Sequence, residues 1–250
     1  MTDRPLISVI IPCYNEEETV PILRERMECL LAAFALSHAV EILFVDDGST
    51  DGTRAALEAM APEMNARVLA HAGNRGIAAA FRTGFREARG DFVCTLDADC
   101  TVDPLELVPM VAELESTGAD VVTASPHHPE GAVEGVQPWR LLLSRGASRI
   151  YEYLLPVKLY SYTMCVRVFR RSALERIDFR SPGFLGVTEM IVSAILQGRK
   201  VIEWPVTLRR RTTGVSKIRT LRVVADHVRF MGRLLARKLS PSPASSAPRT

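Results

Sequence analysis

Short apolar runs alternate with helical segments along the first half of this 250-residue chain, and this alternation constrains the fold most strongly. Runs rich in Val, Ile, Leu and Phe are typical of strands that are buried on both faces of a sheet. We expect such strands at 6–11, 40–45, 67–70, 91–96 and 120–124, and helices at 16–35, 52–60, 76–88 and 104–117. The alternation predicts an α/β fold with a Rossmann-like, mostly parallel central sheet and helices on both faces.

The pattern changes after residue 125. Residues 125–137 are rich in Pro, Gly and His and are expected to form a loop. The remaining elements expected from the sequence are helices at 139–155 and 188–196, strands at 162–169 and 200–205, and a basic loop at 207–217. The chain is thus expected to contain one α/β domain at 1–217, a basic amphipathic helix at 218–239 and a disordered, low-complexity tail at 240–250.

The formal net charge of +2 conceals an uneven distribution of charge. Residues 199–250 contain 13 Lys and Arg but only 2 Asp and Glu, whereas the rest of the chain is acidic. A basic end on an acidic body suggests that the end meets an anion, such as a phosphate, a membrane surface or nucleic acid. We expect no nucleic acid partner, because the body is acidic and no aromatic residues are interleaved with the basic ones.

Several classes of protein are disfavoured by the absence of their motifs. The five cysteines include no CxxC pair, which argues against a disulfide framework or a cysteine zinc site and suits a reducing compartment. The first residues make a poor signal peptide, and polar residues interrupt the apolar stretch at 29–45, so no transmembrane helix is required. Without GxGxxG or a Walker lysine, dinucleotide binding and P-loop chemistry are also disfavoured. We therefore expect a cytoplasmic protein.

Acidic residues follow three of the predicted strands, in Asn15-Glu16, Asp46-Asp47 and Asp97-Ala98-Asp99. In parallel sheets, ligands bind beyond the carboxyl ends of the strands. The carboxylates of Asp97 and Asp99 flank one small residue and would repel each other if held close together. A cation between them would relieve this repulsion. Mg²⁺ or Mn²⁺ suits such oxygen ligands and would bridge the protein to a diphosphate. The alternative is that these residues only form turns, where Asp is common.

Two basic segments near the end of the chain each have two interpretations. The loop that contains Arg211 and Lys217 is either a solvated loop or one that closes over a diphosphate. The helix at 218–239 carries arginines on one face, and the other face carries Leu221, Val224, Val228, Met231 and Leu235. Such a helix suits an anionic bilayer surface, but a helix that packs on its own domain has the same pattern.

Three motifs, in this order, resemble those of family 2 glycosyltransferases with the GT-A fold: Pro12-x-Tyr14-Asn15-Glu16, Val45-Asp46-Asp47-Gly48-Ser49-x-Asp51-Gly52-Thr53 and Asp97-Ala98-Asp99. Further stretches resemble dolichol-phosphate mannosyltransferases and their bacterial polyprenyl-phosphate relatives: Ser144-Arg145-Gly146-Ala147, Glu189-Met190-Ile191-Val192, Glu203-x-Pro205-Val206 and Arg211-x-x-Gly214-x-Ser216-Lys217. The resemblance implies that residues 1–217 form a GT-A catalytic domain.

The resemblance also implies roles for individual residues. The nucleoside of a nucleotide sugar would be held by Pro12, Tyr14, Glu16, Val45 and Asp47. Mg²⁺ or Mn²⁺ would be bound by Asp97 and Asp99, with Ala98 lining the site. Arg211 and Lys217 would meet the donor phosphates, and Arg145 would meet the acceptor phosphate. Catalysis would then depend on Asp99, Arg211 and Lys217.

The implied reaction is an inverting transfer of a hexose from a nucleotide sugar, with GDP-mannose the leading donor, to a polyprenyl or dolichyl phosphate. Many family 2 enzymes have Glu-Asp where this chain has Glu189-Met190. A hydroxyl acceptor needs a general base, whereas a phosphate is already ionised, so Met190 favours a phosphate acceptor. Such an enzyme would work at the cytoplasmic membrane surface. The alternative is a soluble family 2 enzyme that uses a donor such as UDP-glucose and a non-lipid acceptor.

Overall fold

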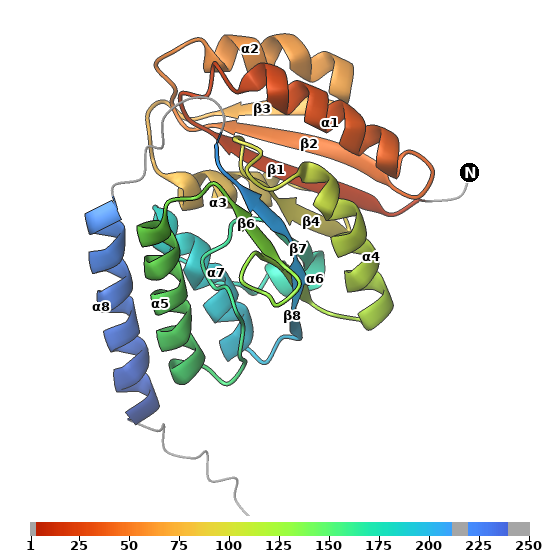
Figure 1. The fold of residues 1–250 in the computed structure, drawn as a ribbon. Helices are drawn as coiled ribbons and strands as arrows, with labels where there is room; N and C mark the ends of the chain where they lie inside the picture. Colours follow the sequence, from red (N-terminus) through yellow and green to blue (C-terminus); the bar gives the residue numbers. More distant parts are fainter. Residues whose placement is uncertain (1–3, 212–219, 240–250) are drawn as a thin grey trace, which may run out of the picture.

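The chain folds around one central sheet with helices on both faces (Figure 1). The structure is a computed structural model that describes residues 4–211 and 220–239. The sheet has seven strands in the order β3-β2-β1-β4-β7-β5-β8. Their bounds are β1 (Leu6–Cys13), β2 (Ala39–Asp46), β3 (Ala66–Ala70), β4 (Phe92–Thr95), β5 (Val121–Ser125), β7 (Arg167–Arg170) and β8 (Val201–Pro205). A separate parallel pair joins β6 (Ala132–Glu134) to β9 (Thr207–Arg209).

The α/β architecture expected from the sequence is confirmed. All strand pairs of the central sheet are parallel except those of β7, which runs antiparallel to both β4 and β5. The helices are α1 (Val20–Phe34), α2 (Thr53–Met60), α3 (Ile77–Glu87), α4 (Leu107–Thr117), α5 (Pro138–Leu154), α6 (Arg171–Leu174), α7 (Phe184–Leu196) and α8 (Thr220–Leu239). Short 3₁₀ turns precede β3 and α4, at η1 (Ala61–Met64) and η2 (Pro104–Glu106).

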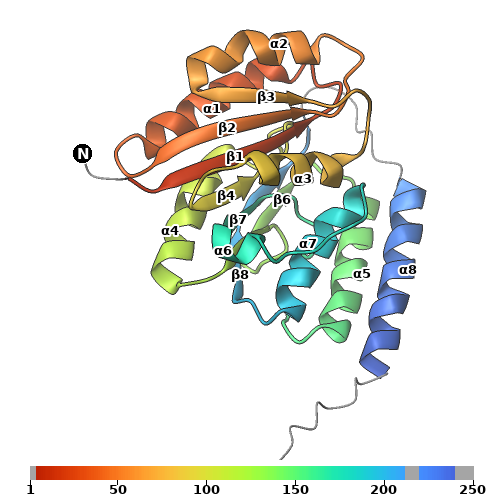
Figure 2. The same cartoon turned by 180° about the vertical axis from the view of Figure 1, so that it is seen from behind.

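Successive residues of β1 point to opposite faces of the sheet and so belong to two different cores. Val9 and Ile11 are fully buried among side chains of α1, α2 and α4. Ile10 is fully buried on the other face, in the cluster that includes residues of α3, α5, α7 and α8. This alternation is the period of two that a strand buried on both faces must have. Figure 2 shows α3 and α7 on the face opposite to α1 and α4.

The first helix begins later than the sequence pattern predicts. We expect Glu16, Glu17 and Glu18 in its first turn, but α1 starts at Val20 and has no acidic residue there. Asn15 has a left-handed backbone (φ 52°), and the Thr19 N–H donates to the Glu16 carbonyl, which closes a turn before the helix. The acidic segment is therefore a loop at the edge of the sheet.

Several predicted boundaries in the second half are wrong. The loop expected at 125–137 contains β6, and the first residues of the basic loop form β9, because these short segments pair with each other. The strand expected at 162–169 is confined to β7, and the short helix α6 follows it directly. Helix α7 begins at Phe184, four residues before the predicted start. The tail at 240–250 lies outside the described residues.

Helix α8 lies beside α5 at one end of the molecule (Figures 1 and 2). Its buried side chains are those of His227, Met231 and Leu234. Met231 therefore faces the domain, whereas Leu221 and Val228 from the same predicted apolar face remain 89% and 62% exposed. The helix packs on its own domain and also keeps an apolar face in solvent. Among the described residues, no helix is both long and apolar enough to span a bilayer.

Candidate functional site

The three acidic strand ends predicted from the sequence meet at one edge of the sheet. Strands β2, β1 and β4 are neighbours and run parallel, so their carboxyl ends lie together. Cys13 of β1 pairs in register with Asp46 of β2, and the Leu96 N–H donates to the Ile10 carbonyl. The loops that begin at residues 14, 47 and 97 thus start side by side, as a ligand site at this edge requires.

Two of these loops are joined by hydrogen bonds. The Asn15 side chain accepts from the Thr50 N–H at 2.7 Å, and the Asn15 N–H donates to the Ser49 hydroxyl at 3.0 Å. Gly48 has a φ of +73°, and a Cβ there would lie 2.4 Å from the Gly73 backbone, so only glycine fits. The loop after β2 is therefore fixed both to the loop after β1 and to residues 71–76.

Asp47 is buried and accepts hydrogen bonds on both carboxylate oxygens. Its Oδ1 accepts from the Arg75 N–H at 2.9 Å, and its Oδ2 accepts from the Gly76 N–H at 2.7 Å. Nδ1 of His71 lies 2.6 Å from Oδ1. The side chain is only 4% exposed. Asp47, predicted as a nucleoside ligand, thus holds the loop that leads into α3 in this structure.

Asp97 and Asp99 follow β4 and lie close enough to influence each other. Burial and the negative charge of Asp99 raise the pKa of Asp97 to about 7. Asp99 accepts from the Thr101 N–H at 3.1 Å through Oδ1, and its side chain is 23% exposed. The raised pKa reflects a negative charge that is incompletely balanced, which is the situation that a bound cation would relieve.

Arg211 brings the basic segment back to the acidic strand ends. Its guanidinium donates to the Glu16 carboxylate, and its Nη1 lies 3.9 Å from Oδ2 of Asp99. The segment is guided there by β9, because the Arg209 N–H donates to the Thr101 carbonyl at 2.8 Å. Arg211 therefore points inward, as is required by the interpretation in which the loop closes over a diphosphate. Lys217 lies outside the described residues.

A divalent cation fits the donor set at Asp97 and Asp99. Both side chains supply carboxylate oxygens, which Mg²⁺ and Mn²⁺ prefer. Within residues 4–211 and 220–239 there is no group of three or more His, Cys, Asp or Glu side chains that could hold a metal. Two carboxylates are nevertheless enough for Mg²⁺, which usually completes its shell with water and substrate phosphates.

The remaining predicted nucleoside residues line the same edge. Pro12 and Tyr14 are half-buried at the end of β1, and Glu16 lies just beyond them. Val45 and Ala98 are buried, so they can shape the site only through the backbone and the side chains around them.

Arg145, predicted to meet an acceptor phosphate, lies on α5. It lines a groove of about 600 Å³ together with the apolar Leu159 and the basic or polar side chains of His127, Ser148, Arg149, Glu152, Lys158 and Tyr160. Burial and the charge of Arg145 lower the pKa of His127, so the imidazole there is neutral near pH 7. Among the described residues, Nδ1 of His127 and Oγ of Ser148 are buried without a hydrogen-bond partner. In the described part of the chain, no hydrogen bond or ion pair joins Arg145 to Asp97 or Asp99.

Two carboxylates position nearby loops and were not singled out as site residues from the sequence. Glu189 accepts from the N–H groups of Arg180 and Ser181 at 2.9 and 2.8 Å and from the Ser181 hydroxyl. Glu203 accepts from the N–H groups of Tyr160 and Ser161 at 2.7 and 2.9 Å, and burial raises its pKa. Both residues lie within stretches that carry the family resemblance, which was the only available signal.

Residues 8–178 match the profile of glycosyl transferase family 2. The chain belongs to this family. It is a glycosyltransferase, and the family and enzyme class predicted from the three motifs are confirmed.

Two curated relatives extend the match beyond the family profile. Polyprenol monophosphomannose synthase of Mycolicibacterium smegmatis is 36% identical over 84% of this chain and 80% of its own length. Dolichol-phosphate mannosyltransferase of Pyrococcus furiosus is 30% identical over 92% of this chain and 63% of its own length. The chain therefore spans less than two thirds of the second relative. Both relatives belong by name to the subgroup that the sequence resembles, the dolichol-phosphate mannosyltransferases and their polyprenyl-phosphate relatives.

Solved structures share the fold. Glucosyl-3-phosphoglycerate synthase of Mycobacterium tuberculosis, in complex with Mn²⁺, UDP and glucosyl-3-phosphoglycerate, matches with a TM-score of 0.67 at 20% identity, over 96% of this chain and 82% of that one. A mannosyltransferase of Pyrobaculum calidifontis, in complex with GDP-Man and Mn²⁺, matches with a TM-score of 0.62 at 22% identity, over 99% and 67%. The expected GT-A fold is confirmed, and these neighbours bind a divalent metal and a nucleotide.

Proposed function

We propose that this glycosyltransferase moves a hexose, with mannose from GDP-mannose the leading candidate, to a polyprenyl phosphate at the cytoplasmic face of a membrane. The observation that carries the proposal is the meeting of Glu16, Asp99 and Arg211 at the acidic edge of the sheet. The names of the two curated relatives, a polyprenol monophosphomannose synthase and a dolichol-phosphate mannosyltransferase, support the choice of acceptor.

The donor diphosphate would be bound by a metal and by cations of the chain. Asp97 and Asp99 would hold Mg²⁺ or Mn²⁺, which supplies positive charge to the departing nucleoside diphosphate. Arg211 donates to the Glu16 carboxylate and pairs with that of Asp99 in this structure, and phosphate oxygens are equally good partners for its guanidinium. Arg211 would therefore exchange its carboxylate partners for the diphosphate, and Lys217 would join it from the same segment.

The acceptor would attack without a general base from the chain. An oxygen of the lipid phosphate forms a bond to the anomeric carbon while the bond from that carbon to the diphosphate breaks, which inverts the configuration. A phosphate monoester is already anionic near pH 7. The thioether of Met190 is not a base, and the Glu189 carboxylate is occupied by loop hydrogen bonds, so neither residue accepts a proton from the acceptor. This arrangement suits a phosphate acceptor and does not suit a hydroxyl.

The groove at Arg145 is the proposed site for the acceptor phosphate. Arg145 and Arg149 of α5 supply positive charge, Lys158 lies 3.8 Å from Glu152, and the Ser148 hydroxyl has no partner in the described residues. A phosphate would satisfy both the charges and this donor. The chain of a lipid phosphate would then leave along α5, where Leu142 is 73% exposed.

Helices α5 and α8 together form the proposed membrane-facing surface, which we name the α5–α8 surface. Its exposed apolar side chains are Trp139, Leu142, Leu143, Ile150 and Tyr153 of α5 and Leu221, Val224, Val228, Leu235 and Leu239 of α8. Exposed arginines stand among them on both helices. Apolar side chains surrounded by cations are the composition that binds an anionic bilayer surface.

The first experiment is product formation with Mn²⁺ or Mg²⁺, a short polyprenyl phosphate, and GDP-mannose beside UDP-glucose. A mannosyl lipid is expected. A glucosyl lipid would keep the mechanism but change the donor. Release of a nucleoside diphosphate without a lipid product from either donor would contradict the lipid acceptor and favour a soluble enzyme with a non-lipid acceptor.

The membrane part of the proposal is tested by vesicle sedimentation. The double variant Leu221→Gln, Val228→Gln should bind anionic vesicles roughly tenfold more weakly or worse, because each apolar side chain contributes about 1.5–3 kcal/mol when buried. Leu36→Gln is the matched control, since Leu36 is 96% exposed on a different part of the molecule. Equal vesicle binding by the double variant and the control would contradict a membrane role for the α5–α8 surface.

A further inference from the structure

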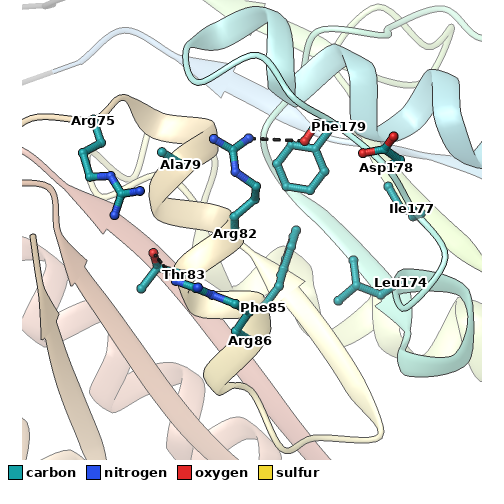
Figure 3. Close-up of a pocket in the computed structure, with 10 residues that line it drawn as sticks. All are labelled: Arg75, Ala79, Arg82, Thr83, Phe85, Arg86, Leu174, Ile177, Asp178 and Phe179. Carbon is teal, nitrogen blue, oxygen red and sulfur yellow. Dashed lines mark hydrogen bonds between the residues drawn. The ribbon is translucent and has the colours of Figure 1, made fainter.

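A second groove, of about 320 Å³, lies between α3 and the segment at 174–179, and none of its residues belongs to the predicted donor or acceptor sites. Figure 3 shows its lining side chains: Arg75, Ala79, Arg82, Thr83, Phe85, Arg86, Leu174, Ile177, Asp178 and Phe179. This volume lies at the lower end of the range for small-molecule sites, which is about 300–1,000 Å³. The groove is thus large enough for a small ligand.

Three arginines line the groove on one side of α3. Arg82 and Arg86 are one helical turn apart, and Arg75 stands just before the first turn of the helix. Like charges four residues apart on a helix destabilise it. Burial, the charge of Arg75 and, more weakly, that of Arg86 lower the pKa of Arg82, and the charge of Glu189 opposes them only in part. The three cations are therefore near enough to repel one another.

No carboxylate compensates these charges in the described part of the chain. None of the three guanidinium groups has a described Asp or Glu oxygen within 4.0 Å, whereas Arg54 and Arg67 each do. The charge of Glu189 acts on Arg82 from beyond that distance and offsets only part of the opposing effects. Arg82 donates only to the carbonyls of Phe179 and Ser181, at 3.3 and 3.4 Å. The one acidic residue of the groove, Asp178, is paired with Arg180. An anion is thus the ligand that the charges of the groove would favour.

The rest of the groove is apolar or aromatic. The guanidinium of Arg82 lies over the Phe179 ring, 5.2 Å from its centroid, and Phe85 packs edge-on against the same ring. Leu174 and Ile177 continue this apolar side. Free phosphate would leave these side chains without a partner, whereas an anion attached to a flat or apolar body would cover them.

We propose that this groove binds a small organic phosphate, with its phosphoryl group among Arg75, Arg82 and Arg86 and its apolar body against Phe85 and Phe179. Guanidinium groups bind phosphate oxygens in pairs with defined geometry. Thr83 adds a hydroxyl at the same end of the groove and already accepts a weak hydrogen bond from Arg86 at 3.4 Å.

The groove is connected to the acidic edge of the sheet. Oγ1 of Thr83 lies 2.9 Å from Nε2 of His71, whose Nδ1 lies 2.6 Å from Asp47. The backbone N–H of Arg75 donates to the same carboxylate. Ligand binding in the groove would thus act on residues that position Asp47, although the groove ligand is distinct from the nucleotide sugar.

The test is calorimetric titration of the full chain with phenyl phosphate and, separately, with inorganic phosphate. Phenyl phosphate is expected to bind more tightly, because only it carries an aromatic body. Arg82→Gln and Arg86→Gln should each weaken phenyl phosphate binding about tenfold or more, because each removes at least one hydrogen bond to a charged group and such a loss corresponds to about that change in Kd. Arg54→Gln, which alters an exposed arginine paired with Glu58, should bind like the unchanged chain. Arg86 is exposed, so its variant keeps the test valid if Arg82→Gln fails to fold.

Three results would overturn the proposal. One is equal affinity for phenyl phosphate in Arg82→Gln, Arg86→Gln and Arg54→Gln. Another is loss of binding in Arg145→Gln only, which would place the probe in the groove on α5. The third is absence of phenyl phosphate binding together with recruitment to phosphatidic acid vesicles that Arg86→Gln reduces, which would identify a lipid headgroup as the ligand.

Discussion

Replacing Asp47 with Asn tests whether this carboxylate holds the loop before α3 or serves only to meet a nucleoside. Asn has nearly the same shape, but it offers one acceptor oxygen and one NH₂ group in place of two acceptors. In the structure, one oxygen of Asp47 accepts from Gly76 and the other from Arg75, with His71 beside it. An NH₂ group placed toward Gly76 would face its N–H, and two donors cannot bond.

The expected loss of stability follows from these contacts. Asp47 is 4% exposed, so water cannot replace the missing acceptor. A hydrogen bond to a charged group contributes about 1.5–3 kcal/mol, and an unsatisfied buried donor costs a similar amount. We expect Asp47→Asn to lower the free energy of unfolding by about 2–3 kcal/mol. For a chain of this size that corresponds to a fall in Tm of about 4–12 °C.

The assay is thermal unfolding followed by circular dichroism, together with calorimetric binding of GDP in the presence of Mn²⁺. Asp103→Asn is the control: Asp103 accepts one backbone N–H, from Leu105, at a helix start where Asn serves equally well, and its partly exposed pair with Arg26 at 3.8 Å contributes little. We expect Asp47→Asn to lose both stability and GDP affinity. A variant that unfolds like the control and yet loses GDP affinity would refute the positioning role and leave only a ligand role.

Three further predictions concern pH and the acceptor. Mn²⁺ affinity should rise as the pH increases through about 7. Burial and a neighbouring carboxylate raise the pKa of Asp97 to about 7, and below that pH a proton competes with the metal. Equal Mn²⁺ affinity in titrations near pH 6 and pH 8 would contradict this prediction. Burial lowers the pKa of His227 from 6.5, so as the pH falls the histidine of the unfolded chain is protonated before that of the folded chain. The stability that neutral His227 contributes beside Tyr151 should therefore be lost as the pH falls below about 6.5. His227→Asn should show a smaller decrease in Tm over that range. Arg145→Gln should raise the KM for polyprenyl phosphate about tenfold and leave the donor KM unchanged, whereas Arg54→Gln, on α2 and outside both the groove and the α5–α8 surface, should change neither.

The strand ends of the site could be predicted from the sequence because apolar runs and polar ends are local features. Residues 6–11 and 40–45 are uninterrupted apolar strands apart from Ser8 and Glu41. Acids come directly after 40–45 and 91–96, and Glu16 follows 6–11 after Pro12-Cys13-Tyr14-Asn15. The adjacency of β2, β1 and β4 comes from the structure, because a parallel sheet alone does not dictate the order of its strands. Contact between Arg211 and Glu16, 195 residues earlier, has no local signal; the family resemblance only assigned both residues to the donor site.

The positioning carboxylates could not be predicted in the same way. Glu189 lies in a helix whose other residues are almost all buried and apolar, so the local pattern gives no reason for a charge there. The reason is tertiary: the Arg180 and Ser181 N–H groups need acceptors, and this loop packs on α3, where the Pro182 carbonyl accepts from Ala78. An acidic residue in an apolar helix is thus explained by orphan backbone donors on another segment.

The orientation of α8 was open for a related reason, because periodicity alone does not say which apolar face a helix buries. The predicted face joined Met231 to Leu221 and Val228, but in the structure Met231 is buried beside His227, which a hydropathy pattern counts as polar. His227 faces inward because the buried Tyr151 hydroxyl needs a partner, and Nδ1 lies 2.8 Å from it. Burying a polar pair rotates the helix so that Leu221 and Val228 stay in solvent, and the same contact that fixes α8 on α5 also creates the apolar surface that we assign to the membrane.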